Sequence, residues 1–231
     1  MSQATVTLHE NAETRMRLLD AAGRLFAESG FEATSVRDIT AEAGCNVASV
    51  NYHFGGKENL YVEAFRVLLG ELRDIRVETI RRDMASVDEP DLEYFLESFA
   101  TGFLDPLVAD GRGRQFMVII NREMADPHLP REMFVEEFLN PLMAVAGEAL
   151  MGVAPSLEPG TARLCLMSMV SQLLHALMIR KYFIPEGGVP VVPGDLATHV
   201  GHIVHFTAGG IRACAVGNNG HPMRSDQGSE E

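Results

Sequence analysis

The chain has 231 residues, of which 46% are hydrophobic, and its formal net charge at pH 7 is −13. This length suits one large domain or two small ones, and the acidic balance argues against a general affinity for nucleic acid. Charged residues, Gly or Pro interrupt every apolar run before it reaches the length of a membrane-spanning helix. The first residues also lack the basic start and apolar core of a secretory signal, so we expect a cytoplasmic protein.

The three cysteines, Cys45, Cys165 and Cys214, are odd in number and lie far apart in the sequence. This pattern fits neither a disulfide framework nor a zinc site. We interpret them as reduced, buried, small apolar residues.

The N-terminal part contains a series of local start and stop signals. Residues 1–12 are expected to be flexible, and apolar residues at helical spacing predict a helix from Glu13 to Ser29, ended by Gly30. Thr34 or Ser35 can cap a short helix, because Asp38 follows Ser35 at the spacing of a capping box. Gly44 ends that helix.

Asn46 is placed to cap a second short helix over residues 47–53. A longer helix, a short helix, a turn and a second short helix form a helix-turn-helix. We therefore assign residues 13–60 to a DNA-binding domain.

In a helix-turn-helix the second short helix enters the major groove. Val50 and Phe54 have the spacing to face inward, whereas Asn51 can bond adenine and small apolar residues can meet thymine methyl groups. Side chains around this helix can hold phosphates, and Lys57 adds its charge to the N-terminus of the next helix. The residues expected to contact DNA are Thr34, Ser35, Arg37, Val47, Ala48, Asn51, Tyr52, His53 and Lys57.

After Gly55-Gly56 the pattern predicts a long helix from Lys57 to about Met84, followed by helices near 90–108, 112–126, 131–151, 160–184 and 195–215. No alternating strand pattern persists, so the fold class is all-α. We assign residues 61–216 to a second helical domain and expect residues 217–231 to be a disordered tail, because they are polar and contain Gly.

Residues 14–66 resemble the TetR family of bacterial one-component transcriptional regulators. The resemblance rests on Thr34, Ile39-Thr40, Ala43-Gly44, Tyr52-His53-Phe54 and Lys57-Glu58-Asn59-Leu60, with Thr40 standing where the family has Ala. The strings VNYHFGGKE and REMADP are similar to the CecR-like subgroup. The resemblance implies a C-terminal helical ligand-binding and dimerisation bundle, and repression of neighbouring genes, often for efflux or small-molecule handling.

The second domain is rich in Phe and Met, which suit either an ordinary bundle core or an adaptable pocket for an apolar or aromatic ligand. Arg122 and Glu123 form an external ion pair or provide an inward polar group. The candidate ligand-binding residues are Phe95, Phe99, Phe103, Phe116, Ile120, Arg122, Glu123, Phe138, Gln172 and His175.

The last two predicted helices, near 160–184 and 195–215, carry long apolar faces. In the resembled family these helices form a four-helix dimer interface, which would present two recognition helices about 35 Å apart to a palindromic operator. His199 and His205 point about 120° apart on a helix, so we expect no metal there, and no cofactor is expected.

The sequence therefore predicts a homodimeric, ligand-responsive DNA-binding regulator, a repressor released from its operator by a small apolar or aromatic effector. One alternative is a helical hydrolase using His53 or His175, although no Gly-x-Ser-x-Gly turn, Walker loop or HExxH motif occurs. The other is a protein-interaction module that does not bind DNA, which the acidic charge favours.

Overall fold

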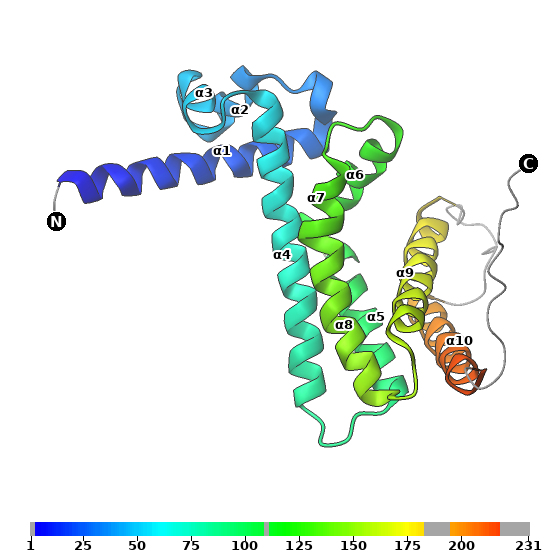
Figure 1. Ribbon diagram of the computed structural model, residues 1–231. Helices are drawn as coiled ribbons and strands as arrows, with labels where there is room; N and C mark the ends of the chain where they lie inside the picture. The colour runs from blue at the N-terminus through cyan, green and yellow to red at the C-terminus, as the bar shows by residue number, and fades with distance from the viewer. Residues whose placement is uncertain (1–2, 109–110, 183–194, 218–231) are drawn as a thin grey trace, which may run out of the picture. The chain divides into compact units, whose positions relative to one another are not determined.

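The computed structural model describes residues 3–108, 111–182 and 195–217. Within these ranges the chain forms helices and no strand, as the all-α prediction requires (Figure 1). The elements are α1 (Gln3–Ala33), α2 (Val36–Ala43), α3 (Ala48–Phe54), α4 (Lys57–Ala85), α5 (Leu92–Val108), α6 (Arg112–Ala125), α7 (Arg131–Met133), the π-helix η1 (Phe134–Leu139), α8 (Asn140–Val153), α9 (Pro159–Tyr182) and α10 (Leu196–Gly217). None of the helices described is long and apolar enough to cross a membrane.

The two ends of the chain differ from the sequence-based expectations. Helix α1 begins at Gln3, so residues 3–12, which were predicted to be flexible, are helical. Gly30 interrupts α1 with a φ of 84°, and residues 31–33 follow it. Of the tail predicted at 217–231, Gly217 is the last residue of α10 and the rest lies outside the described residues.

The chain folds as two compact units, Met1–Arg76 with Leu104–Leu142 and Val77–Phe103 with Met143–Glu231. The first unit joins the three N-terminal helices to the start of α4 and to α6, α7 and η1. Its core therefore extends past residue 60, where we placed the domain boundary. Residue 60 therefore marks only a proposed boundary between the DNA-binding and the ligand-binding functions.

The N-terminal helices of the first unit pack on one another through their apolar faces. Helix α1 lies against α2 and α3, and the Phe26 ring of α1 meets the Tyr61 ring at the start of α4, with 4.8 Å between the ring centres. Burying each of these large side chains stabilises the fold by about 1.5–3 kcal/mol. The fully or nearly fully buried residues include Leu18, Phe26, Ile39, Val50 and Leu60.

A proline explains the π-helical turn between α7 and α8. Pro141 has no N–H group to donate to the carbonyl of Glu137, and the backbone of η1 widens just before it. The guanidinium of Arg73 on α4 donates to that carbonyl at 2.9 Å. The single helix predicted over 131–151 is thus a continuous helical run with a π-turn that is held by α4.

The second unit contains the end of α4, most of α5 and α8, and all of α9 and α10. Gly102 lets α5 approach α4 closely, since a Cβ atom there would lie 2.8 Å from a methyl group of Thr79. Asp83 accepts a hydrogen bond from Ser98 at 2.7 Å between the same two helices. Helices α9 and α10 pack side by side (Figure 1).

The three cysteines are free thiols, but none of them is buried. Cys45 and Cys165 are half-buried, and Cys214 is exposed in the last turns of α10. This corrects the interpretation of all three as buried apolar residues.

Candidate nucleic-acid interface and effector cavity

The start of α2 is fixed by a capping box. The Ser35 hydroxyl accepts a hydrogen bond from the Asp38 N–H at 3.2 Å, and the Asp38 carboxylate accepts one from the Ser35 N–H at 3.2 Å. The Ser35 hydroxyl also donates to that carboxylate at 2.6 Å. These hydrogen bonds lower the pKa of Asp38, and Gly44 ends the helix with a φ of 62°.

The two threonines of this region turn their hydroxyls away from solvent. Thr34 is buried, and its hydroxyl donates to the carbonyls of Leu25 and Gly30 at 3.1 and 2.7 Å. This corrects the expectation that the Thr34 side chain contacts DNA. Thr40 is also buried, and its hydroxyl donates to Val36 at 2.9 Å within α2. A Thr therefore fits where the resembled family has Ala.

Helix α3 is anchored on one side and open on the other. Asn46 accepts a hydrogen bond from the Ala48 N–H at 2.9 Å, as predicted for its capping role. Val50 and Phe54 are 0% and 7% exposed and hold α3 on the core. The opposite side presents side chains that we expected to meet base edges, all exposed, namely Val47, Ala48 and Asn51.

The groups flanking α3 are held by ring contacts. Tyr52 is 75% exposed, and its ring meets that of the half-buried His53 edge-on at 4.9 Å. The ammonium of Lys57, at the start of α4, lies 4.3 Å from the centre of the Phe31 ring. Gly55 adopts a φ of 77°, which lets the chain turn between α3 and α4. The remaining predicted contacts, Ser35 and Arg37, are exposed at the start of α2.

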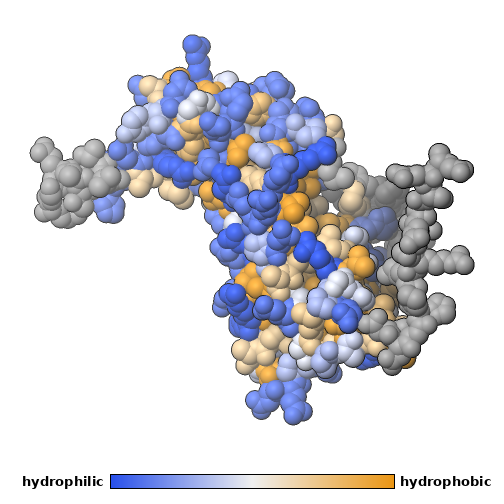
Figure 2. All heavy atoms as spheres, in the orientation of Figure 1, coloured by the Kyte–Doolittle hydropathy of each residue, from blue (hydrophilic) through white to orange (hydrophobic). Residues whose placement is uncertain are grey.

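The surface over these helices is polar. On the face shown in Figure 2, hydrophilic side chains cover most of the part formed by α1, α2 and α3, with a few apolar residues among them. Arg24 and Glu42 form an ion pair at 2.9 Å between α1 and α2, which stabilises little because it is exposed.

Helix α6 caps the end of α1 with an arginine. The Arg122 guanidinium donates to the carbonyls of Phe26 and Ala27, each at 2.8 Å, and to that of Glu28 at 3.0 Å. These carbonyls belong to the turn of α1 just before Gly30, and a cation near the end of a regular helical stretch also favours the helix dipole. Arg122 thus neither faces a ligand nor pairs with Glu123, which corrects both expectations for its side chain.

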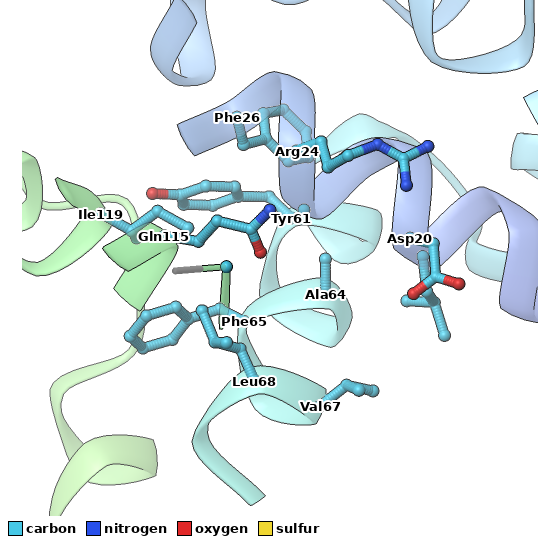
Figure 3. A pocket seen from close by; sticks show the side chains of 13 residues that line it. Asp20, Arg24, Phe26, Tyr61, Ala64, Phe65, Val67, Leu68, Gln115 and Ile119 are labelled. Carbon is cyan, nitrogen blue, oxygen red and sulfur yellow. The ribbon is translucent and has the colours of Figure 1, made fainter. Parts of the chain in front are cut away.

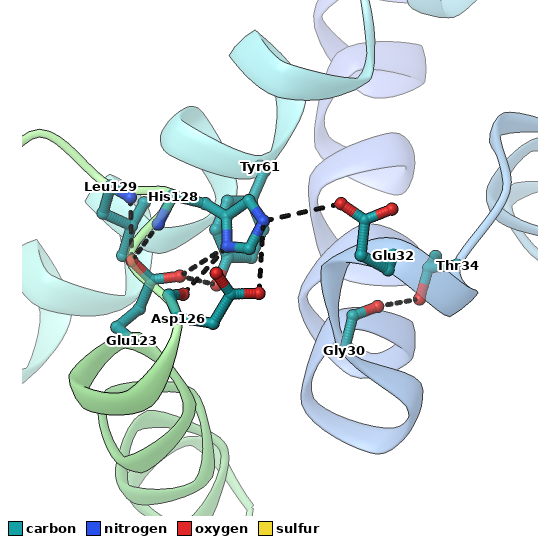
Figure 4. Close-up of polar contacts among 8 residues, drawn as sticks. All are labelled: Gly30, Glu32, Thr34, Tyr61, Glu123, Asp126, His128 and Leu129. Atoms are coloured by element: carbon teal, nitrogen blue, oxygen red, sulfur yellow. Dashed lines mark hydrogen bonds and ion pairs between the residues drawn. The ribbon is translucent and has the colours of Figure 1, made fainter.

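Glu123, the next residue, connects α6 to α4 and to the turn that follows α6 (Figure 4). Its carboxylate accepts hydrogen bonds from the Tyr61 hydroxyl at 2.7 Å and from the N–H groups of His128 and Leu129, both at 2.8 Å. Burial raises the pKa of Tyr61, and the hydrogen bond and charge of Glu123 raise it further against the opposing charge of Arg122. The phenol therefore remains a donor at all ordinary pH values.

His128 extends this connection to the N-terminal helices (Figure 4). Its ring lies 4.6 Å from that of Phe31, and its Nε2 atom lies 3.6 Å from the Glu32 carboxylate. Phe26 and Phe31 both contact the Tyr61 ring, at 4.8 and 5.1 Å. We call Arg122, Glu123, His128 and Tyr61 the joint, because they tie α6 to α1 and α4.

The first unit contains a mainly apolar cavity beside the joint. It has a volume of about 270 Å³ and its lining residues come from α4, α6, the following turn and the start of η1. Glu123 of α6 and Arg131 of α7 are the charged residues that line it. The other lining residues are Phe65, Ile120, Pro127, Leu129, Pro130, Met133 and Phe134.

A smaller cavity of about 190 Å³ is lined by residues of α1, α4 and α6, among them Tyr61 and Phe65. Figure 3 shows the Gln115 side chain extending between the rings of these two residues. Asp20 and Arg24 of α1 add charged groups to its rim. This cavity is more polar and lies under the N-terminal helices.

The structure divides the predicted ligand-binding residues between the two units. Phe116, Ile120, Arg122, Glu123 and Phe138 belong to the first unit, and Phe95, Phe99, Phe103, Gln172 and His175 to the second. In the second unit the three Phe rings stack along α5 and are buried. The Gln172 amide donates to Ser168 of its own helix, and His175 is exposed, which corrects its assignment to a pocket wall.

Sequence reasoning missed three residues that organise the first unit. Tyr61 directly follows Lys57-Glu58-Asn59-Leu60, and His128 directly follows REMADP, both of which carry the family resemblance. The residues that Tyr61 and His128 contact lie far away in the sequence. Arg76 is only 2% exposed and lies over the Phe138 ring at 5.3 Å. Its burial lowers the pKa of the guanidinium. A single Arg in a helical pattern carries no signal of such burial.

The helical fold, the exposed α3 and the cavity together define a helix-turn-helix protein with a second helical region. Comparisons with known proteins identify its family. A sequence model described as "Bacterial regulatory proteins, tetR family" matches residues 18–64, and one described as "Tetracyclin repressor-like, C-terminal domain" matches residues 97–210. The chain belongs to the TetR family of bacterial regulatory proteins.

Individual relatives match shorter stretches of the chain. The repressor KstR2 of Rhodococcus jostii is 47% identical over 58 residues, which are 25% of this chain and 28% of KstR2. The dual regulator CecR of Shigella flexneri is 39% identical over 62 residues, or 27% of each chain. The chain therefore spans little more than a quarter of the length of these relatives.

A solved structure matches over a longer range. A protein from Mesorhizobium loti assigned to the TetR-family transcriptional regulators covers 86% of this chain and 96% of its own, with a TM-score of 0.66 and 17% identity. At this identity the likeness shows the fold alone.

Proposed function

We propose that this chain is a cytoplasmic, homodimeric transcriptional repressor that binds a palindromic operator and releases it when a small effector binds. The observation that carries the proposal is the exposed side of α3, where Val47, Ala48 and Asn51 face outward while Val50 and Phe54 anchor the helix. Family membership supports this function, and α3 has the position of a recognition helix.

The apolar cavity beside the joint supports a class of effector. Its volume of about 270 Å³ suits a compact molecule near the small end of the range for ligand sites. The lining is aromatic and aliphatic, with Glu123 as its carboxylate. We therefore propose a small apolar or aromatic effector with at most one group that donates hydrogen bonds to Glu123.

The joint supplies a route from this cavity to the N-terminal helices. Glu123 both lines the cavity and accepts the hydrogen bond of Tyr61, and its neighbour Arg122 caps α1. A ligand that moves the end of α6 would strain both contacts and thereby shift α1 and α4. To convert a 1:99 population into 99:1, the effector must prefer the released state about 10⁴-fold, or about 5.5 kcal/mol.

A gel-shift titration with the DNA upstream of the chain's own gene tests the first part of the proposal. At physiological salt we expect binding to that fragment to exceed binding to random DNA of equal length by about 10³-fold or more. Equal affinity for the two fragments would contradict the proposal. It would favour the interaction module that the acidic charge also allows.

The cavity is tested by filling it. Ile120→Trp places a larger side chain in the cavity wall, and we expect it to abolish the thermal shift that an effector causes in a screen of small aromatic compounds, while operator binding persists. Ile75→Trp, at an exposed position of α4, is the matched control. An unchanged thermal shift in Ile120→Trp would place the effector elsewhere.

A further inference from the structure

Two cysteines that are far apart in the sequence lie together on neighbouring helices of the second unit. Cys165 is on the second turn of α9 and Cys214 on the last turns of α10. Helices α9 and α10 pack against each other (Figure 1). The two side chains are close enough to interact, because Cys214 contributes to the raised pKa of the Cys165 thiol.

Both cysteines continue the inward faces of their helices. On α10, Cys214 lies about two turns after the buried Thr207 and on the same side of the helix. On α9, Cys165 lies about one turn before the buried Met169 and about three turns before the buried Ala176. Cys165 and Cys214 therefore lie on the sides of α9 and α10 that carry buried residues, with Cys214 at the exposed end of α10.

The two thiols differ in their access to solvent. Cys214 is exposed, whereas Cys165 is half-buried. Burial raises the pKa of Cys165, and the neighbouring Cys214 raises it further. The raised pKa keeps Cys165 protonated until it attacks the oxidised Cys214. Cys214, which is exposed, is the thiol that a dissolved oxidant reaches first.

We propose that Cys165 and Cys214 are a reversible redox site that a hydroperoxide converts into a disulfide between α9 and α10. The Cys214 thiolate attacks one oxygen of hydrogen peroxide, the O–O bond breaks, and a sulfenic acid forms with release of hydroxide. The Cys165 sulfur then loses its proton, attacks the Cys214 sulfur and displaces hydroxide. Two thiols and one peroxide give one disulfide and two waters, and a dithiol reductant reverses the reaction by exchange.

The location of the disulfide gives it a consequence for the whole protein. Helices α9 and α10 carry exposed apolar residues, among them Leu164 and Phe206, and form the proposed dimer face. A bond between their ends fixes the angle between the two helices. The oxidised protein would then hold one arrangement of this face, and oxidants would change operator affinity independently of the organic effector.

The test uses the full-length chain, treated with a small excess of hydrogen peroxide and then with a maleimide that labels free thiols. We expect one labelled thiol in place of three, an intact mass lower by two hydrogen atoms, and a peptide pair that maps to Cys165 and Cys214. Dithiothreitol should restore all three thiols. A disulfide between two chains through Cys214, or a modification confined to Cys45, would overturn the proposal.

Single substitutions separate the roles of the two thiols. Cys45→Ser is the matched control and should form the disulfide as the natural chain does. In Cys165→Ser we expect a sulfenic acid at Cys214, trapped by dimedone, and in Cys214→Ser no rapid oxidation of Cys165. Equal dimedone labelling of Cys214 in the natural chain and in Cys165→Ser would show that Cys165 does not resolve it. The disulfide is mapped without DNA. A chain that fails to bind an operator would therefore contradict the proposed function but not the redox site.

Discussion

At the scale of single residues, Asn51 is the side chain best placed to read a base. It is exposed on α3, next to the exposed Tyr52 and opposite the buried Val50. An amide can make two hydrogen bonds to the edge of adenine in the major groove. Because Asn51 supports no buried contact, its loss should alter DNA recognition without unfolding the helix.

We therefore expect Asn51→Ala to reduce the preference for the operator over random DNA by about 1–3 kcal/mol. Competition gel shifts at fixed salt measure this preference. Arg37→Ala, at an exposed residue of α2, should instead weaken binding to both DNAs alike if Arg37 contacts phosphate. An unchanged preference in Asn51→Ala would exclude it as the base-reading residue.

A second residue-scale prediction concerns acid stability. The hydrogen bond from Ser98 is the largest cause of the lowered pKa of Asp83, and the neighbouring Arg82 adds to it. Since the folded pKa is below the ordinary value of 3.8, the ionised carboxylate stabilises the fold above that value. The stabilisation is lost as the pH falls through the folded pKa.

Ser98→Ala should accordingly lower the free energy of unfolding by about 1 kcal/mol at pH 7, a low figure because the Asp83 carboxylate is partly exposed. The difference from the natural chain should shrink as the pH falls below 3.8, because Asp83 is then protonated first in the unfolded state and, at lower pH, in the folded state as well. Urea titrations at pH 7 and pH 3 measure it. A difference that is the same at both pH values would mean that the loss of Ser98 acts through packing alone.

At the scale of elements, the boundaries of α2 and the start of α3 could be predicted because their signals are local, whereas the start of α1 could not. Ser35 with Asp38, Gly44 and Asn46 each act on backbone groups within a few residues, so the sequence order contains the whole interaction. The Pro141 π-turn is different, because its stabilising donor, Arg73, lies on another helix. The position of the π-turn follows from Pro141. The continuity of the helix through that turn does not follow from Pro141 alone.

The candidate site divides in the same way. The exposed side of α3 was predictable from the spacing of Val50 and Phe54, since a short helix with two inward residues must turn its other residues outward. The roles of Arg122 and Glu123 were not predictable. Both bind backbone or side-chain groups of helices that are distant in sequence, and neither periodicity nor composition records such partners.

The joint attaches α6 to α1 through Arg122, and this attachment can be tested by substitution. Arg122→Met keeps the length of the side chain but removes all three hydrogen bonds to the α1 carbonyls. We expect a loss of about 1–2 kcal/mol in the free energy of unfolding. We also expect amide hydrogen exchange in residues 31–40 to become faster than in the natural chain, with a smaller increase in α9.

Arg81→Met, the same change at an exposed arginine of α4, is the control and should leave both measurements near those of the natural chain. Uniformly faster exchange in Arg122→Met, in both compact units, would show a global loss of stability. That result would contradict a specific role of Arg122 in positioning α1.

At the scale of the whole molecule, the exposed apolar residues of α9 and α10 bear on assembly. Leu164 and Met178 are 60% and 42% exposed on α9, and Phe206 and Val216 are 65% and 74% exposed on α10. Apolar side chains gathered on two packed helices mark an interaction surface. A second copy of this chain is the partner that a palindromic operator requires, because a two-fold axis relates both the half-sites and the recognition helices.

We therefore expect light scattering after gel filtration to find a dimer, and Phe206→Glu to shift it to a monomer with unchanged helical circular dichroism. Because the interface has two-fold symmetry, the substitution adds one negative charge to each copy. Both added charges then destabilise the same interface. The monomer should bind the full operator about 10²–10⁴-fold more weakly, because the second recognition helix no longer binds from a tethered position.

Val108→Glu introduces the same charge at a valine of α5 that is 52% exposed, and it should remain dimeric. If Phe206→Glu also remains dimeric, the α9–α10 face is not where the copies meet. If it becomes monomeric and still binds the full operator with the affinity of the natural chain, the recognition helices act singly. Dimerisation would then serve the effector response rather than the spacing of half-sites on DNA.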